Sequence, residues 1–194
     1  MFINWQSKEI NLKIVYYGAA LSGKTTNLEW MHQKIAPSMR GNLVSLKTRE
    51  DRTIFFDFMQ IELGEIKGLK PKFNLYTVPG QVFYVASRKL VLQGADGVVF
   101  VADSQPDRMK ENIETWQNLQ MNLRDLGNDP ATFPVVLQYN KRDMPNAMPV
   151  EKMRAELGCN GRLQIEAIAV QGIGVFETLR PTIRSVLDKI MTRL

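Results

Sequence analysis

The sequence predicts an α/β fold, with helices on both faces of a mostly parallel β-sheet. The first observation is that strand-like and helix-like segments alternate along the chain. The second is that segments 98–102 and 135–139 are almost entirely apolar, which is typical of strands buried on both faces. With 194 residues, 44% of them hydrophobic, the chain is long enough to bury a full core, so we expect one domain over residues 1–194.

We expect about six strands. The first covers 12–17, and the next two, at 54–61 and 72–77, are joined by a short link that has a glycine at each end, Gly64 and Gly68. Such a link is typical of a β-hairpin, so this pair should make the one antiparallel contact of the sheet. The remaining strands are expected at 98–102, 135–139 and 165–168.

Helices are expected between these strands. The first follows a glycine-containing loop and covers 26–35. Apolar residues that recur every three or four positions predict two longer helices, over 109–123 and 175–194, each with one apolar face. We interpret these faces as parts of the core; grooves for a partner are the less favoured interpretation.

The composition narrows the class of protein. The formal net charge is +5, but the lysines and arginines are scattered along the chain, so a nucleic-acid partner is not expected. The single cysteine, Cys159, cannot form an internal disulfide, and the single histidine, His32, has no cysteine beside it that would suggest zinc. No apolar run reaches the roughly 20 residues of a membrane span, and the ends lack signals for secretion or lipidation. We therefore expect a cytoplasmic protein without a direct lipid anchor.

Residues 18–25 follow the pattern Gly-x-x-x-x-Gly-Lys-Thr and lie between the first strand and the first helix. In this context the backbone N–H groups of the loop point at phosphate oxygens, and the helix N-terminus adds positive potential. Lys24 would reach the β- and γ-phosphates, and the Thr25 hydroxyl would bind Mg²⁺. The predicted phosphate-binding residues of this loop are Gly18, Ala19, Leu21, Ser22, Gly23, Lys24, Thr25 and Thr26.

A second motif, Asn140-Lys141-Arg142-Asp143, directly follows the buried strand 135–139. The Asp143 carboxylate can accept hydrogen bonds from N1–H and the 2-amino group of guanine, a pair that adenine does not offer. The Asn140 amide can tie the base to the phosphate loop, and the stem of Lys141 can lie over the ring. This motif predicts guanine as the base.

Two further segments fit the hydrolysis of GTP. Gly80, after the strand 72–77, can donate its N–H to a γ-phosphate, and Gln81 can orient an attacking water. Thr53 could complete the oxygen ligands of Mg²⁺, and the guanidinium of Arg52 could bind the transferring phosphoryl group. A solvated charged loop is the alternative interpretation of Arg52.

Together these motifs resemble the Ras-like small GTPases and closely match the mutual gliding motility (MglA) subfamily, over essentially the whole chain. The resemblance implies a P-loop, Ras-like G domain that acts as a Mg²⁺-dependent GTP/GDP switch in bacterial polarity and motility. It also implies polarity effectors, recruitment to the cell poles and a homodimeric Roadblock-type activating partner (MglB), which orders Arg52 and Gln81 of the switch itself. The Ala169 N–H is carried over from a base-binding loop usually written Ser-Ala-Lys, here Ile168-Ala169-Val170.

Besides this loop, the chain departs from most small GTPases at two further positions. Thr77 stands where most have the aspartate of Asp-x-x-Gly, a loss that the MglA subfamily shares; Asp57 is expected across the hairpin and could compensate. Ala20 stands where many relatives have glycine and could slow hydrolysis. A GTP-loaded scaffold with negligible hydrolysis therefore remains an alternative function. A P-loop kinase is a weaker alternative, because it would give the Asn-Lys-x-Asp motif no role.

Overall fold

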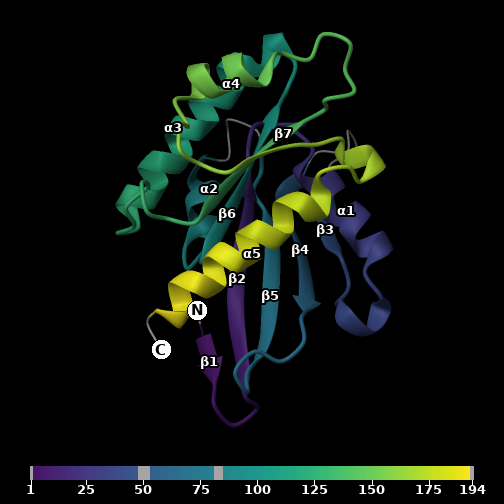
Figure 1. Cartoon of the computed structure of the whole chain (residues 1–194), viewed down its shortest axis with the longest axis vertical. Coiled ribbons are helices and arrows are strands. Elements are labelled where there is room, and N and C mark those ends of the chain that lie inside the picture. The colour runs from purple at the N-terminus through teal and green to yellow at the C-terminus, as the bar shows by residue number, and fades with distance from the viewer. Residues whose placement is uncertain (1, 48–52, 81–84, 193–194) are drawn as a thin grey trace.

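The computed structural model describes residues 2–47, 53–80 and 85–192. Its centre is a twisted sheet in the order β3-β4-β5-β2-β6-β7-β8 (Figure 1). Strand β1 pairs with the first three residues of β2. Within the described residues the strands are β1 Phe2–Asn4, β2 Glu9–Tyr17, β3 Val44–Lys47, β4 Thr53–Glu62, β5 Lys70–Thr77, β6 Gly97–Asp103, β7 Val135–Asn140 and β8 Gln164–Glu166.

Helices cover both faces of this sheet. Helices α1 and α5 lie on one face, and α2, α3 and α4 lie on the other (Figure 1). Strand β2 shows why both faces are apolar: Ile14 and Tyr16 pack toward α1 and α5, whereas Val15 and Tyr17 pack toward α3, and all four are fully buried. The helix bounds are α1 Lys24–Lys34, α2 Val85–Leu92, α3 Met109–Asp125, α4 Val150–Leu157 and α5 Val175–Met191.

The mostly parallel sheet is confirmed, because β5, β2, β6, β7 and β8 are parallel neighbours. The antiparallel pair β4–β5 is also confirmed. The expectation of a single antiparallel contact is wrong, because β1–β2 and β3–β4 are antiparallel as well. The described residues form eight strands, slightly more than the expected six or so. Strands β1 and β3 have three and four residues, so their pairing depends on the neighbouring strand more than on an apolar pattern of their own.

Helices α3 and α5 occupy the segments where the apolar spacing predicts them. Helices α2 and α4, of eight residues each, were not predicted. Helix α4 begins after Pro149 and is followed by Gly158, whose φ of 60° is in the left-handed region that commonly ends helices. None of the helices in residues 2–47, 53–80 and 85–192 is long and apolar enough to cross a membrane.

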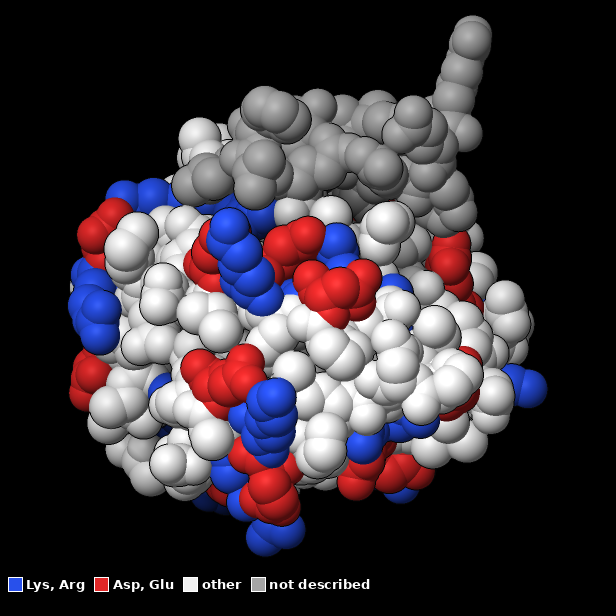
Figure 2. All heavy atoms as spheres, turned by 90° about the horizontal axis from the view of Figure 1, so that it is seen from above, with Lys and Arg blue, Asp and Glu red and all other residues white. Residues whose placement is uncertain are grey.

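The carboxyl ends of β2, β6 and β7 meet at the upper end of the molecule in Figure 1. Parallel α/β sheets commonly bind ligands at this edge. Figure 2 shows the molecule from that end, with lysine and arginine atoms interspersed among aspartate and glutamate atoms rather than gathered in one basic patch. The site described below lies at this edge.

Candidate functional site

The loop between β2 and α1 has the backbone conformation that the Gly-x-x-x-x-Gly-Lys-Thr pattern predicts. Gly23 has a φ of 101°, and a Cβ atom there would lie 2.1 Å from Asn140 Nδ2, so only glycine fits. Leu21 also adopts a positive φ, 60°. Helix α1 begins directly after this loop, at Lys24. Backbone N–H groups and a helix N-terminus are therefore presented together, as an anion-binding loop requires.

The side chain of Lys24 is buried against this loop. Its Nζ donates hydrogen bonds to Gly18 O (3.0 Å) and Ala19 O (2.6 Å). Burial, together with the positive charges of Arg88 and Arg108, lowers the pKa of Lys24 to about 7. Asp57 raises this pKa, but by less than the other effects lower it. A phosphate beside this ammonium would favour its charged form.

Ser22 adds a second group suited to phosphate. Its hydroxyl is buried and has no hydrogen-bond partner within the part of the chain that the structure describes. A buried hydroxyl of this kind is expected to find a partner. An anion held by the loop could supply one.

A cluster of oxygen atoms lies beside the start of α1. Asp57 in β4 is fully buried, and its Oδ2 accepts hydrogen bonds from Thr25 Oγ1 (2.5 Å) and Thr77 Oγ1 (2.7 Å). Its Oδ1 accepts a hydrogen bond from the Ser45 hydroxyl. The expectation that Asp57 lies across the hairpin from Thr77 is confirmed, and the Asp57 N–H also donates to Thr77 Oγ1 at 2.8 Å. A carboxylate beside hydroxyl groups is a donor set that fits Mg²⁺. No group of three or more His, Cys, Asp or Glu side chains suited to a metal occurs among the described residues.

The Asn140 motif is linked to the phosphate loop and to the Ala169 segment. Asn140 Nδ2 donates to Ser22 O (2.8 Å), and Asn140 Oδ1 accepts from Ala169 N (2.9 Å). A cavity of about 320 Å³ opens beside these bonds. The residues that line it are Leu21, Gly23, Thr26, Gln105, Asn140, Lys141, Asp143, Met144, Ala169 and Val170. The structure thus brings all four predicted base-binding residues to one cavity, next to the phosphate loop.

The position of Lys141 depends on a residue that the motifs did not indicate. Lys141 Nζ makes a 2.6 Å ion pair with Asp103, whose side chain is fully buried at the end of β6. The Lys141 backbone adopts a φ of 66°, and the ion pair holds its side chain at the cavity. An aspartate directly after the apolar run 98–102 was the sequence signal for this partner.

Gly80 lies against the phosphate loop. A Cβ atom on Gly80 would lie 2.3 Å from Ala20 Cα, so the two backbones are in direct contact. Two arginines that the motifs did not indicate, Arg88 in α2 and Arg108 before α3, bind the carbonyl groups of this contact. No sequence signal identifies them, because α2 was not predicted and Arg108 acts across the tertiary structure.

Three predicted residues cannot be compared in full with the structure. Arg52 and Gln81 lie outside the described residues. Thr53 begins β4, but its side chain is not part of the description. Their roles stay predictions from the sequence and from the resemblance.

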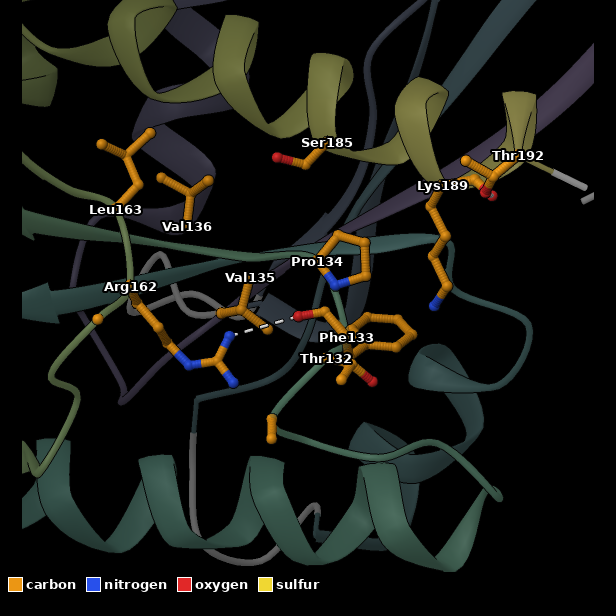
Figure 3. A pocket seen from close by; sticks show the side chains of 12 residues that line it. Thr132, Phe133, Pro134, Val135, Val136, Arg162, Leu163, Ser185, Lys189 and Thr192 are labelled. Atoms are coloured by element: carbon orange, nitrogen blue, oxygen red, sulfur yellow. Dashed lines mark hydrogen bonds between the residues drawn. The ribbon is translucent and has the colours of Figure 1, made fainter.

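A larger cavity, of about 520 Å³, lies away from this edge, between the start of β7 and the end of α5 (Figure 3). Arg162 and Lys189 enter it from opposite sides. Arg162 Nη1 donates to Phe133 O (3.3 Å), and Lys189 Nζ lies 4.7 Å from the centre of the Phe133 ring. None of the predicted nucleotide-binding residues lines this cavity, so it is separate from the site.

Comparison with known proteins assigns the family. The family model of the ADP-ribosylation factor family matches residues 1–193. The chain is 55% identical over 189 residues to the mutual gliding-motility protein MglA of Myxococcus xanthus (strain DK1622), and the match covers 97% of each chain. It is 29% identical over 162 residues to ADP-ribosylation factor-like protein 6 of Caenorhabditis briggsae, covering 79% of this chain and 71% of that protein.

A more distant similarity extends to Ras-related protein Rab-7a of Dictyostelium discoideum, which is 23% identical over 184 residues, or 93% of this chain and 84% of that protein. The resemblance to Ras-like small GTPases and to MglA is thereby confirmed. The chain belongs to the ADP-ribosylation factor family of small GTP-binding proteins, and within it is closely similar to the gliding-motility protein MglA.

Proposed function

We propose that this chain is a Mg²⁺-dependent molecular switch that binds and hydrolyses GTP and controls cell polarity and motility. The observation that carries the proposal is the double hydrogen bond of Asn140, which joins the phosphate loop at Ser22 O to the base cavity at Ala169 N. A ligand with both a polyphosphate and a base would contact both of the segments that Asn140 joins. The family and the similarity to MglA support the same function.

Guanine is the base that we propose for this cavity. Asp143 lines the cavity, and its carboxylate would accept from N1–H and the 2-amino group. The Lys141 stem would face the ring. The Ala169 N–H donates to Asn140 Oδ1 in this structure and would exchange that bond to reach the guanine oxygen. Adenine would leave the carboxylate without these donors, so the selectivity comes from a lost pair of hydrogen bonds.

Mg²⁺ would be held by Thr25 and Thr53, with Asp57 in place of the usual carboxylate. Support comes from the 2.5 Å hydrogen bond between Thr25 Oγ1 and Asp57 Oδ2, which puts a buried carboxylate beside the predicted ligand. Mg²⁺ would offset the charge of the β- and γ-phosphates.

In the proposed reaction, a water oxygen forms a bond to the γ-phosphorus while the bond from the β–γ bridging oxygen to that phosphorus breaks. The products are GDP, inorganic phosphate and a proton. Lys24 and the Gly80 N–H would bind the γ-phosphate, Gln81 would orient the water, and Arg52 would bind the transferring group. The resemblance to the MglA subfamily is the support for Arg52 and Gln81.

The switch would be read by partners. Lys24, Thr53 and Gly80 would bind the γ-phosphate. Its loss would release the segments around 47–57 and 78–90, a change of order or register of the kind that GTPase partners recognise. We propose a homodimeric Roadblock-type (MglB-like) activating protein, polarity and motility effectors, and recruitment to the cell poles through them.

A second function has one observation in its favour. The Ala20 backbone contacts Gly80, so an alanine, where many relatives have glycine, lies next to a predicted γ-phosphate contact. Under this alternative the chain is a GTP-loaded scaffold with negligible hydrolysis.

Phosphate release from GTP, measured with and without the Roadblock-type partner, tests the two functions. We expect slow release alone and strong stimulation by the partner. Arg52→Ala and Gln81→Ala should each retain GTP binding and lose about 10³–10⁵-fold of stimulated turnover, the value of such an arginine in related enzymes. Release that stays negligible with the partner would favour the scaffold. Near-normal turnover of Arg52→Ala would assign the arginine to the partner.

A further inference from the structure

Two arginines outside the nucleotide motifs hold the two backbones that meet in the phosphate site. Arg88 is 3% exposed; its Nε donates to Pro79 O (2.9 Å) and its Nη2 to Gly80 O (2.6 Å). Arg108 is the last residue of the short helix η3 (Pro106–Arg108), and its Nη2 donates to Ala20 O (2.8 Å). Because Gly80 and Ala20 are in contact, the two guanidinium groups hold this contact from both sides.

Both arginines are fixed to α3. Arg88 Nη1 lies 3.5 Å from Asn118 Oδ1, an oxygen that also accepts a 2.6 Å hydrogen bond from the Tyr17 hydroxyl. Arg108 makes a 2.5 Å ion pair with Glu111. A planar guanidinium that is bound at several points keeps its direction, which a flexible ammonium does not. Helix α3 is therefore a rigid support for the Pro79–Gly80 turn and for the phosphate loop.

The buried charge of Arg88 is expensive if its role is packing alone. Moving a cation out of water costs free energy that only well-formed polar contacts offset, and an apolar side chain of similar length avoids the cost. The contacts that Arg88 makes are directed at two successive carbonyl groups of the turn, Pro79 O and Gly80 O. The side chain is thus arranged to fix the backbone of the turn.

We propose that Arg88 is a positioning residue for GTP hydrolysis, an inference that rests on the proposed function. Arg88 holds the Pro79–Gly80 turn so that the Gly80 N–H reaches the γ-phosphate. Arg108 holds the phosphate loop at the opposite side of the same contact.

The test compares Arg88→Ala and Arg88→Lys with Lys89→Ala. Lys89 is the matched control, because it lies in the same helix and forms a surface pair with Asp125 of α3 (2.8 Å). Single-turnover GTP hydrolysis of Arg88→Ala should fall about tenfold or more, while its GDP affinity stays within about threefold of the unsubstituted protein. Arg88→Lys keeps the positive charge but lacks the planar guanidinium with its several donors. Its hydrolysis rate should therefore lie between those of Arg88→Ala and the unsubstituted protein. Lys89→Ala should hydrolyse GTP normally.

Rescue by guanidinium separates positioning from packing. Millimolar guanidinium should restore part of the rate of Arg88→Ala and leave the unsubstituted protein unchanged. Methylammonium has the same charge without the planar fork and should not restore the rate. Equal rescue by both ions, or a rate that falls only in parallel with GDP affinity and thermal stability, would overturn the inference.

A further measurement does not depend on hydrolysis. The affinity for a non-hydrolysable GTP analogue, divided by the affinity for GDP, should fall about tenfold in Arg88→Ala, because the Gly80 N–H loses its position relative to the γ-phosphate. If the unsubstituted protein and its partner release no phosphate, the proposed function fails, whereas this ratio still tests Arg88. An unchanged ratio overturns the inference, whatever the rate.

Discussion

The Asp57 carboxylate accepts hydrogen bonds from the hydroxyl groups of three elements: Thr25 of α1, Ser45 of β3 and Thr77 of β5. Most small GTPases place an aspartate at the position of Thr77. In this chain β5 supplies a hydroxyl group at that position, and β4 supplies the carboxylate. A carboxylate therefore lies beside Thr25 although the usual motif is absent.

Replacement of this carboxylate should therefore weaken Mg²⁺ binding. We expect Asp57→Asn to raise the Mg²⁺ concentration that half-protects bound GDP from release by about tenfold, because the charge that supports the ion is lost. The measurement is the GDP dissociation rate across a Mg²⁺ titration. Ser45→Ala is the control, because it removes one hydrogen bond and leaves the charge. An unchanged midpoint in Asp57→Asn would contradict the role given to Asp57.

At the scale of elements, strand β6 and helix α5 approach each other closely at one point. A Cβ atom on Gly97 would lie 2.5 Å from Val186 Cγ2 and 3.5 Å from Thr182 Cγ2. Val186 is fully buried against the sheet. Glycine at the first position of β6 thus allows α5 to lie flat on its face of the sheet.

An alanine at this position should force the two elements apart. We expect Gly97→Ala to lower the free energy of unfolding by about 1–3 kcal/mol, the usual effect of overpacking a core. Val186→Ala leaves a cavity and should also destabilise, but the double variant should lose less than the sum, because the new methyl group occupies part of that cavity. Urea unfolding of the four proteins measures the coupling. Strictly additive losses would show that the two side chains do not share this space.

Elements with their own sequence pattern were predicted correctly, and those without one were not. The apolar faces of α3 and α5 and the apolar runs of β6 and β7 are formed by residues within each segment, so they can be recognised from the sequence. Strands β1 and β3 depend instead on the edge to which they pair. The same distinction holds in the site. Asn140 belongs to a motif and was found, and Asp57 follows from hairpin register, but Arg88 and Arg108 bind backbone carbonyls across the tertiary structure, which leaves no local pattern.

At the scale of the whole molecule, the candidate site is assembled from segments that are far apart in the chain. The phosphate loop, the Gly80 turn, the Asn140 motif and the Ala169 segment follow four different strands and meet at one edge of the sheet. A ligand that contacts all of them binds only the folded chain. Its binding energy therefore adds directly to the stability of the fold.

Guanine nucleotides should accordingly raise the melting temperature. With GDP and Mg²⁺ at 100 times the dissociation constant, we expect about 2.7 kcal/mol of added stability, or an increase of about 5–10 °C for a chain of this size. The measurement is thermal unfolding with GDP and, in parallel, with ADP. ADP should have little effect, and Asp143→Ala should lose most of the response to GDP. An equal increase with ADP would contradict the preference for guanine.

The bonds of Asn140 have one further consequence. A single amide contacts both the loop that would surround the phosphates and the segment that would face the base, so the two halves of the site are not mechanically independent. A partner that pulls the Ala169 segment outward would withdraw one end of that link and loosen the Ser22 carbonyl at the other. Nucleotide release could then be started from the base side, by a protein that never touches Mg²⁺ or the phosphates.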